Sequence, residues 1–177
     1  MFELDKVQAK ITSFNPRAEK HGEENVPAGD IRVQVACPNT ILDHFGKGLR
    51  PTLYRKAAAD EGSTTDVRDV PGNLTSRTMP QLKPLQFDGD WPGYSAVIVP
   101  GMGLTDPIEL DDVKLSNFQL EPMDGGTVVV TFSVSFHPDE EQSGRLCSLI
   151  NNMVELTLVA PTNNKASKKD ERQAGLV

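Results

Sequence analysis

Hydrophobic and polar positions alternate along much of the chain, which is the period of two expected of β-strands that bury one face. Residues 4–13 and 31–37 show this alternation, and 127–136 continues it without a break. The stretch 94–100 is mostly apolar and short, as expected of a central strand. The pattern predicts six strands: 4–13, 31–37, 94–100, 113–121, 127–136 and 154–160.

The alternation changes phase inside one of these strands. The apolar set begins with Val113 and Leu115 and continues with Phe118 and Leu120, a shift of one residue. Because a shift of one residue moves every following side chain to the other face, a regular strand cannot bury both halves of the set. We therefore predict a β-bulge at 116–117.

Two connections between predicted strands have different character. Asp124-Gly125-Gly126 lies between two strands, and glycine adopts positive φ at little cost, so we predict a tight hairpin there. The segment 15–29 contains proline, glycine and many charged residues, and it reads as a long hairpin connection rather than a tight turn.

A short helix is predicted after the second strand. Asn39 is a suitable N-cap, Ile41, Leu42 and Phe45 share an apolar side, and Gly46 ends the pattern.

A second, amphipathic helix is predicted after Pro138, which cannot continue a strand ladder. Asp139 is a suitable N-cap, and the acidic side chains of Glu140 and Glu141 fall in the first turn, where the helix dipole favours negative charge. The apolar positions that follow have helical spacing: Leu146, Leu149, Ile150 and Met153.

Together these elements predict a mainly β fold of the α+β class. We expect a curved antiparallel sheet or an OB-like barrel with one short and one amphipathic helix, and the bulge favours the barrel. Residues 1–162 form one domain, 57–84 is predicted to be a mobile loop because it is rich in Gly, Pro, Ser, Thr and Asp, and 163–177 is a polar, disordered tail.

Charge limits the partners that the chain could bind. The formal net charge is -7 over 177 residues, and without the tail it is -9, from 14 basic and 23 acidic residues. Such a surface repels duplex DNA unless the basic residues are localised. No apolar run approaches the roughly 20 residues that span a bilayer, and residues 1–10 do not resemble a secretory signal. We expect a cytoplasmic protein with no membrane partner.

Catalytic and metal-binding motifs are weak in this sequence. Cys37 and Cys147 are far apart and are interpreted as buried, inert thiols. A zinc site could assemble from His21, His137 and a carboxylate such as Glu23, but solvated loop histidines are the preferred interpretation. The glycines of 46–50 and 101–103 lack the spacing of phosphate-binding and dinucleotide-binding loops. We expect a protein that is not an enzyme and needs no cofactor or metal.

One basic segment differs from the acidic remainder of the chain. Residues 45–56 contain four cations and no carboxylate, interleaved with Phe45 and Tyr54. Cations that follow phosphates and rings that stack on bases are what single-stranded nucleic acid requires. The alternative is that the cations pair with neighbouring acids while the rings belong to the core. The predicted nucleic-acid-binding residues are Lys47, Arg50, Tyr54, Arg55 and Lys56.

Residues 15–31, 42–56 and 124–146 resemble a family of small proteins of tailed phages and prophages, usually of unassigned function and often encoded near recombination or replication genes. The resemblance implies a phage protein in a bacterial host. It is compatible with single-strand binding through 45–56 and the His21 loop. It is also compatible with an acidic inhibitor or adaptor that binds a host or phage protein through Glu140, Glu141 and Asp111, or with a virion component. The sequence does not decide whether the protein forms homo-oligomers.

Overall fold

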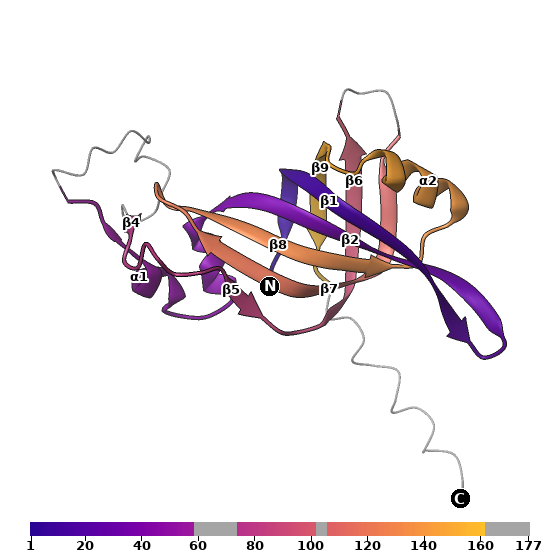
Figure 1. The fold of residues 1–177 in the computed structure, drawn as a ribbon, viewed down its shortest axis with the longest axis horizontal. Coiled ribbons are helices and arrows are strands. Elements are labelled where there is room, and N and C mark those ends of the chain that lie inside the picture. Colours follow the sequence, from indigo (N-terminus) through magenta and orange to yellow (C-terminus); the bar gives the residue numbers. More distant parts are fainter. Residues whose placement is uncertain (59–73, 102–105, 162–177) are drawn as a thin grey trace, which may run out of the picture.

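The computed structural model describes residues 1–58, 74–101 and 106–161 (Figure 1). The strands are β1 (Leu4–His21), β2 (Glu24–Pro38), β3 (Tyr54–Lys56), β4 (Leu74–Arg77), β5 (Leu85–Phe87), β6 (Trp91–Pro100), β7 (Ile108–Pro122), β8 (Thr127–Phe136) and β9 (Met153–Val159). The helices are the 3-10 helix η1 (Asn39–His44), α1 (Leu49–Leu53) and α2 (Glu140–Ser148).

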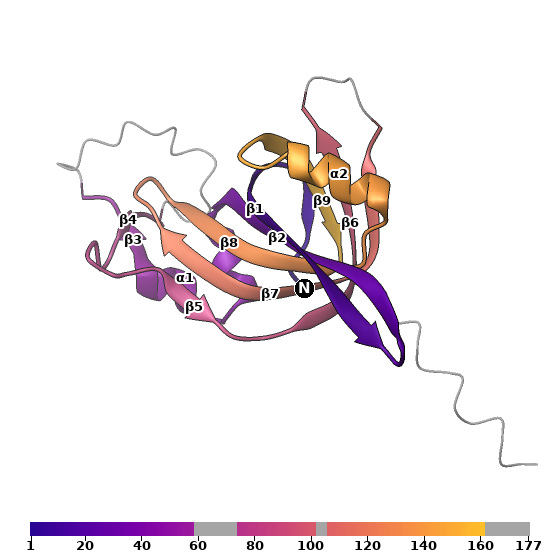
Figure 2. The same cartoon turned by 45° about the vertical axis from the view of Figure 1, so that its right-hand side comes forward.

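An antiparallel sheet closes on itself to form a barrel. Its strand order within the described residues is β5-β7-β6-β9-β1-β2-β8, and β7 also pairs with β8. Six strands therefore form a closed ring, while β5 lies outside the ring against β7 (Figures 1 and 2). The predicted mainly β fold is confirmed, and the curved sheet is an OB-like barrel rather than an open sheet.

Alternate side chains of every ring strand point into the barrel and are buried. Phe132 is fully buried in β8, and Phe2 packs against it from the N-terminus with ring centroids 5.5 Å apart. Burying one such side chain stabilises the fold by about 1.5–3 kcal/mol. The inward residues of the ring strands include Ala9, Ile11, Ile31, Val33, Val35, Ala96, Ile98, Val113, Leu115, Phe118, Leu120, Val128, Val130, Phe132, Val134, Leu156 and Leu158.

The predicted bulge in β7 is confirmed. The pairing of β7 with β8 shifts register between Ser116 and Gln119, and Asn117 has a φ of 53°. Asn is one of the few non-glycine residues that tolerate this conformation. The extra residue allows Leu115 and Phe118 to be buried on the same side of the strand.

The N-terminal cap of α2 is also confirmed, and it has the form of a capping box. The Asp139 carboxylate accepts from the Gln142 backbone N–H at 2.7 Å, and the Gln142 side chain accepts from the Asp139 N–H at 3.1 Å. Leu146 is buried against the barrel. Met153 does not belong to this helix as predicted, because α2 ends at Ser148 and Met153 is an exposed residue of β9.

The prediction of a long connection at 15–29 is wrong. β1 and β2 remain paired as far as His21 and Glu24, and the chain reverses through Gly22, which has a φ of 68°. The resulting hairpin projects beyond the barrel (Figures 1 and 2). Beyond the barrel, neither face of the hairpin packs against the hydrophobic core. The segment therefore lacks the alternation of apolar residues that marks the other strands.

Two further expectations need correction. Asn39 is fully buried inside η1 and does not cap it; its side-chain amide instead donates to the Leu74 carbonyl at 2.7 Å. The predicted loop 57–84 is too wide, because Leu74–Arg77 forms β4 and pairs with β3. The part at 59–73 and the predicted tail at 163–177 lie outside the described residues.

Replacing Asn117 by Val should lower the free energy of unfolding by about 1–2 kcal/mol, because a β-branched residue is strained at positive φ. Gln119→Val is the matched control, since this residue lies on the same strand beyond the bulge and its change should stay within about 0.5 kcal/mol. Denaturant titration measures both values. Equal effects of the two substitutions would contradict the assigned bulge.

Candidate functional site

The basic segment 45–56 lies at one end of the barrel, where β3 and β4 meet the turn between β7 and β8 (Figure 1). Arg77 of β4 forms an ion pair with Asp124 of that turn at 2.9 Å. Lys47, Arg55 and Lys56 are exposed. Three of the five predicted binding residues are therefore on the surface.

Tyr54 is a core residue and is not available for stacking on a base. Its side chain is 1% exposed. The hydroxyl donates to the Thr127 carbonyl at 2.6 Å, lies 2.9 Å from the Met123 carbonyl and accepts from the Met123 N–H at 3.0 Å. Burial raises the pKa of Tyr54 to about 12. Its prediction as a stacking residue is wrong, because the side chain is buried and its hydroxyl is bonded to the backbone of the turn between β7 and β8.

Phe45 belongs to an aromatic cluster at the same end of the barrel. Its ring centroid lies 5.4 Å from that of Phe87, 5.6 Å from that of Trp91 and 5.3 Å from that of Phe118. Contacts of this kind stabilise a core beyond simple burial. The alternative interpretation, in which the rings of 45–56 pack inward, therefore holds for both aromatic residues.

Arg50 interacts with a carboxylate close to it in the chain. One guanidinium nitrogen lies 3.7 Å from the Asp43 carboxylate, and only 23% of the side chain is exposed. Its Nε is buried and lacks a hydrogen-bond partner within the described residues. Arg50 is therefore less accessible to a ligand than Lys47 or Lys56.

A band of polar side chains crosses the outside of the barrel over β1, β2, β8 and β7. The strand register aligns them in two neighbouring rows. We call this band the polar face; its residues are Lys10, Gln34, Thr131 and Gln119 in one row and Ser13, Arg32, Ser133 and Ser116 in the other. Neither row contains a carboxylate, although the chain carries a net charge of -7.

Arg32 is the central cation of the polar face. Its Nη1 donates to the Asn117 carbonyl at 2.9 Å and to Ser133 Oγ at 3.1 Å. The bulge in β7 places that carbonyl beside the guanidinium group. Among the described residues no carboxylate lies within ion-pair distance of Arg32, so its charge is held in place by neutral groups.

The carboxylates at the hairpin border of the polar face share one cation. Arg17 forms ion pairs with both Asp30 and Glu19. The hydrogen bond from Arg17, and after it the one to His137, lowers the pKa of Glu19 below its ordinary value. The hydrogen bonds that Arg17 donates to Asp30 and, as the smaller cause, to Glu19 raise the pKa of Arg17. The negative charge nearest the polar face on this side is therefore partly neutralised.

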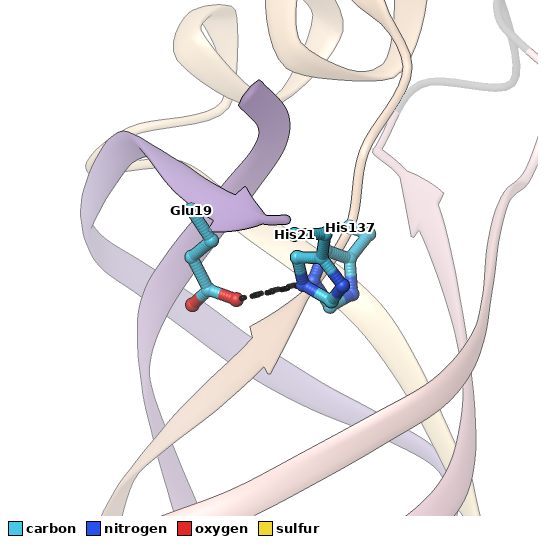
Figure 3. Close-up of side chains that lie close together, drawn as sticks. All are labelled: Glu19, His21 and His137. Atoms are coloured by element: carbon cyan, nitrogen blue, oxygen red, sulfur yellow. Dashed lines mark hydrogen bonds and ion pairs between the residues drawn. The ribbon is translucent and has the colours of Figure 1, made fainter. Parts of the chain in front are cut away.

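A histidine cluster lies on the projecting hairpin and the residue that follows β8 (Figure 3). His137 Nε2 lies 3.3 Å from Glu19 Oε2, and His21 Nε2 lies 3.8 Å from the same oxygen. The two imidazole centroids are 5.9 Å apart and the rings are perpendicular. The structure thus brings together the two histidines that the sequence offers as zinc ligands, but the carboxylate between them is Glu19 rather than Glu23.

The two cysteines differ from each other. Cys37 is buried in the barrel, and burial raises its pKa to about 11, so it is the inert thiol that was predicted. Cys147 is exposed on α2, which contradicts the expectation that it is buried. Both thiols are free.

The acidic residues proposed for a protein partner lie on and beside α2. Glu140 and Glu141 are exposed in its first turn, and Asp111 is exposed on β7. Gln142 Nε2 donates to the Glu109 carbonyl at 2.9 Å, which holds the start of α2 against β7. Asp139 has the architectural role that the sequence predicts.

No protein-family model, curated protein or solved structure matches the chain. Within the described residues, no helix is both long and apolar enough to cross a membrane. Function must therefore be inferred from the surfaces of the barrel.

Sequence reasoning missed the polar face because its residues come from two strand pairs, β1 with β2 and β7 with β8, that are far apart in the chain. The available signal was the alternation in 127–136, whose outward positions include Thr131 and Ser133. Their alignment with Lys10 and Arg32 requires the register of the sheet.

Tyr54→Phe should lower the free energy of unfolding by about 0.5–1.5 kcal/mol, because it removes the buried hydroxyl that bonds Met123 and Thr127, while the backbone hydrogen bond between those two residues remains. Thr52→Ala removes an exposed side-chain hydrogen bond in the same segment and should change stability by no more than about 0.5 kcal/mol. Chemical denaturation measures both. A neutral Tyr54→Phe substitution would contradict the structural role given to this hydroxyl.

Proposed function

We propose that the protein binds single-stranded nucleic acid without catalysing a reaction, and that the strand lies across the polar face and reaches the basic end of the barrel. The observation that carries this proposal is the polar face itself, two adjacent rows without a carboxylate on a strongly acidic chain. Lys10 and Arg32 supply its charge.

The arrangement suits a flexible single strand better than a duplex. Each row spans four strands spaced about 4.8 Å apart, so the face is narrow and follows the curvature of the barrel. A single strand can bend to stay on it, whereas a straight duplex would extend over the acidic surfaces on either side, where like charges repel. On one side, between the face and the basic end, Glu121 shares its row with the uncharged Val129 and Ala36, so a single strand can reach the basic end over those two residues. The ion-paired Asp30 borders the face on the other side.

The binding residues differ in part from those predicted from the sequence. Lys47 and Lys56 keep the role of phosphate contacts at the basic end, and Arg55 is exposed beside them. Tyr54 supports the fold and Arg50 pairs with Asp43, so neither is a primary contact. With the rings of 45–56 in the core, phosphate contacts dominate the binding energy, and we expect little preference for base sequence.

The hairpin that carries His21 and the basic segment lie at opposite ends of the barrel (Figure 1). They do not form the single contact surface suggested by the resemblance to phage proteins. A protein of phage replication or recombination would meet its single strand along the barrel wall that lies between them.

Single-stranded DNA of about 16 nucleotides should bind the full-length chain, and the affinity should fall steeply between about 50 and 200 mM salt. Lys10→Gln with Arg32→Gln, and separately Lys47→Gln with Lys56→Gln, should weaken binding. Each lost phosphate contact should reduce the slope of log K against log salt by about 0.7. Fluorescence anisotropy of a labelled oligonucleotide measures both quantities.

The matched control is Lys20→Gln with Arg145→Gln, which removes the same charge from the hairpin and from α2. This variant should bind as the unchanged protein does. Equal weakening by all three double variants would indicate only a general charge effect and would overturn the assigned face. Absence of binding at low salt, together with capture of a protein partner that requires Glu140 and Glu141, would favour the acidic adaptor instead.

A further inference from the structure

The side chains of Glu19, His21 and His137 bring three metal-ligating atoms together, all within 4.8 Å of one another. We propose that this cluster binds one Zn²⁺ ion and that the ion clamps the projecting hairpin to the segment between β8 and α2. The proposal assigns a site beyond single-strand binding and does not depend on it.

The ligand chemistry fits zinc. Imidazole nitrogen and carboxylate oxygen are ligands that Zn²⁺ uses, at bond lengths of about 2.0–2.2 Å. Tetrahedral coordination at those lengths separates neighbouring ligand atoms by about 3.3–3.6 Å. Glu19 Oε2 lies 3.3 Å from His137 Nε2 and 3.8 Å from His21 Nε2. The third pair, His21 and His137, lies within 4.8 Å, so the two imidazoles must approach each other by up to about 1.5 Å for the three atoms to surround one ion.

Arg17 orients the carboxylate for this role. Its Nε donates to Glu19 Oε1 at 3.1 Å and its Nη2 to the same oxygen at 2.6 Å. The other oxygen, Oε2, is the one that faces the imidazoles (Figure 3). Partners of this kind, which fix the orientation of a ligand, typically strengthen metal binding. The charge of Arg17 is balanced by Asp30, so it opposes a cation less than an unpaired guanidinium would.

Two of the ligands lie on paired strand backbone. Glu19 and His21 are two residues apart on β1 and therefore project from the same side of the strand. His21 is held by its pairing with Glu24 across the turn. Both ligands of the hairpin thus come from paired strand positions rather than from an irregular loop.

The third ligand is positioned by the end of β8. Phe136 pairs with Gly29 of β2, and its ring stacks on that of Phe14 with centroids 6.3 Å apart. A Cβ atom at Gly29 would lie 2.7 Å from the Phe14 ring, so glycine is needed for this close approach. His137 follows immediately, before the cap of α2 at Asp139.

A metal ion here would link Glu19 to His137, which are 118 residues apart in the chain. The hairpin projects from the barrel, so a link at this place should reduce its local opening. Three protein ligands leave one tetrahedral position for water or for a group of a partner. Both imidazoles are accessible from solvent, with His21 60% and His137 52% exposed in their side chains.

Isothermal titration of the untagged, chelator-treated full-length protein with Zn²⁺ should show one ion per chain. Co²⁺ should give visible absorption of a four-coordinate complex at the same stoichiometry. His21→Ala, His137→Ala and Glu19→Gln should each weaken the affinity for Zn²⁺ about tenfold or more. The matched controls are His44→Ala and Glu23→Gln, a histidine and a carboxylate outside the cluster, and both should leave the affinity unchanged.

The clamp is tested by hydrogen exchange of the backbone amides. Zn²⁺ should slow exchange in the hairpin of the unchanged protein and in His44→Ala, and it should have no effect on the hairpin of His137→Ala. Circular dichroism verifies that the variants fold, which is expected because the three side chains are on the surface. Zinc affinity equal in His137→Ala and His44→Ala would overturn the site. Binding of zinc without slower exchange would overturn the clamp.

Discussion

Pairing of β7 with β8 is the interaction on which the architecture depends, because it closes the run β7-β6-β9-β1-β2-β8 into a ring. A closed ring leaves its own strands without open edges, and it gives the inward side chains an enclosed core. The pairing needs the bulge at Asn117, without which Leu115 and Phe118 could not both face inward. Tyr54 then fixes the turn that connects these two strands.

Closure of the ring also determines where polar groups, and therefore binding sites, can lie. With the interior filled by apolar side chains, polar groups are confined to the outer wall, the two ends and the hairpin that leaves the ring. The bulge contributes directly to the wall, because the Asn117 carbonyl that it exposes accepts a hydrogen bond from Arg32. One local irregularity therefore serves both the core and the polar face, and the cation it holds is the centre of the proposed binding surface.

The sequence predicted features that depend on local pattern and missed those that depend on register. Alternation revealed the ring strands, the phase change revealed the bulge, and Asp139 revealed the cap of α2. The hairpin was missed because its strands extend past the barrel, where no core demands apolar residues. Tyr54 was misassigned because an aromatic residue between cations suits a binding segment and a core equally well. Its burial is decided by the turn at Met123 and Thr127, far away in the chain.

Arg17 connects the two proposed sites through a single balance of charge. Asp30 lies in the row next to Arg32 and Glu19 lies farther out on the hairpin; without a cation between them their two negative charges would repel a polyanion on this side of the barrel. Arg17 pairs with both, so the three side chains together carry one net negative charge. A divalent cation bound to Glu19 would reverse the sign of the remaining charge. At low salt, where charges are screened less, the hairpin would then attract the phosphates of a strand that extends beyond the polar face.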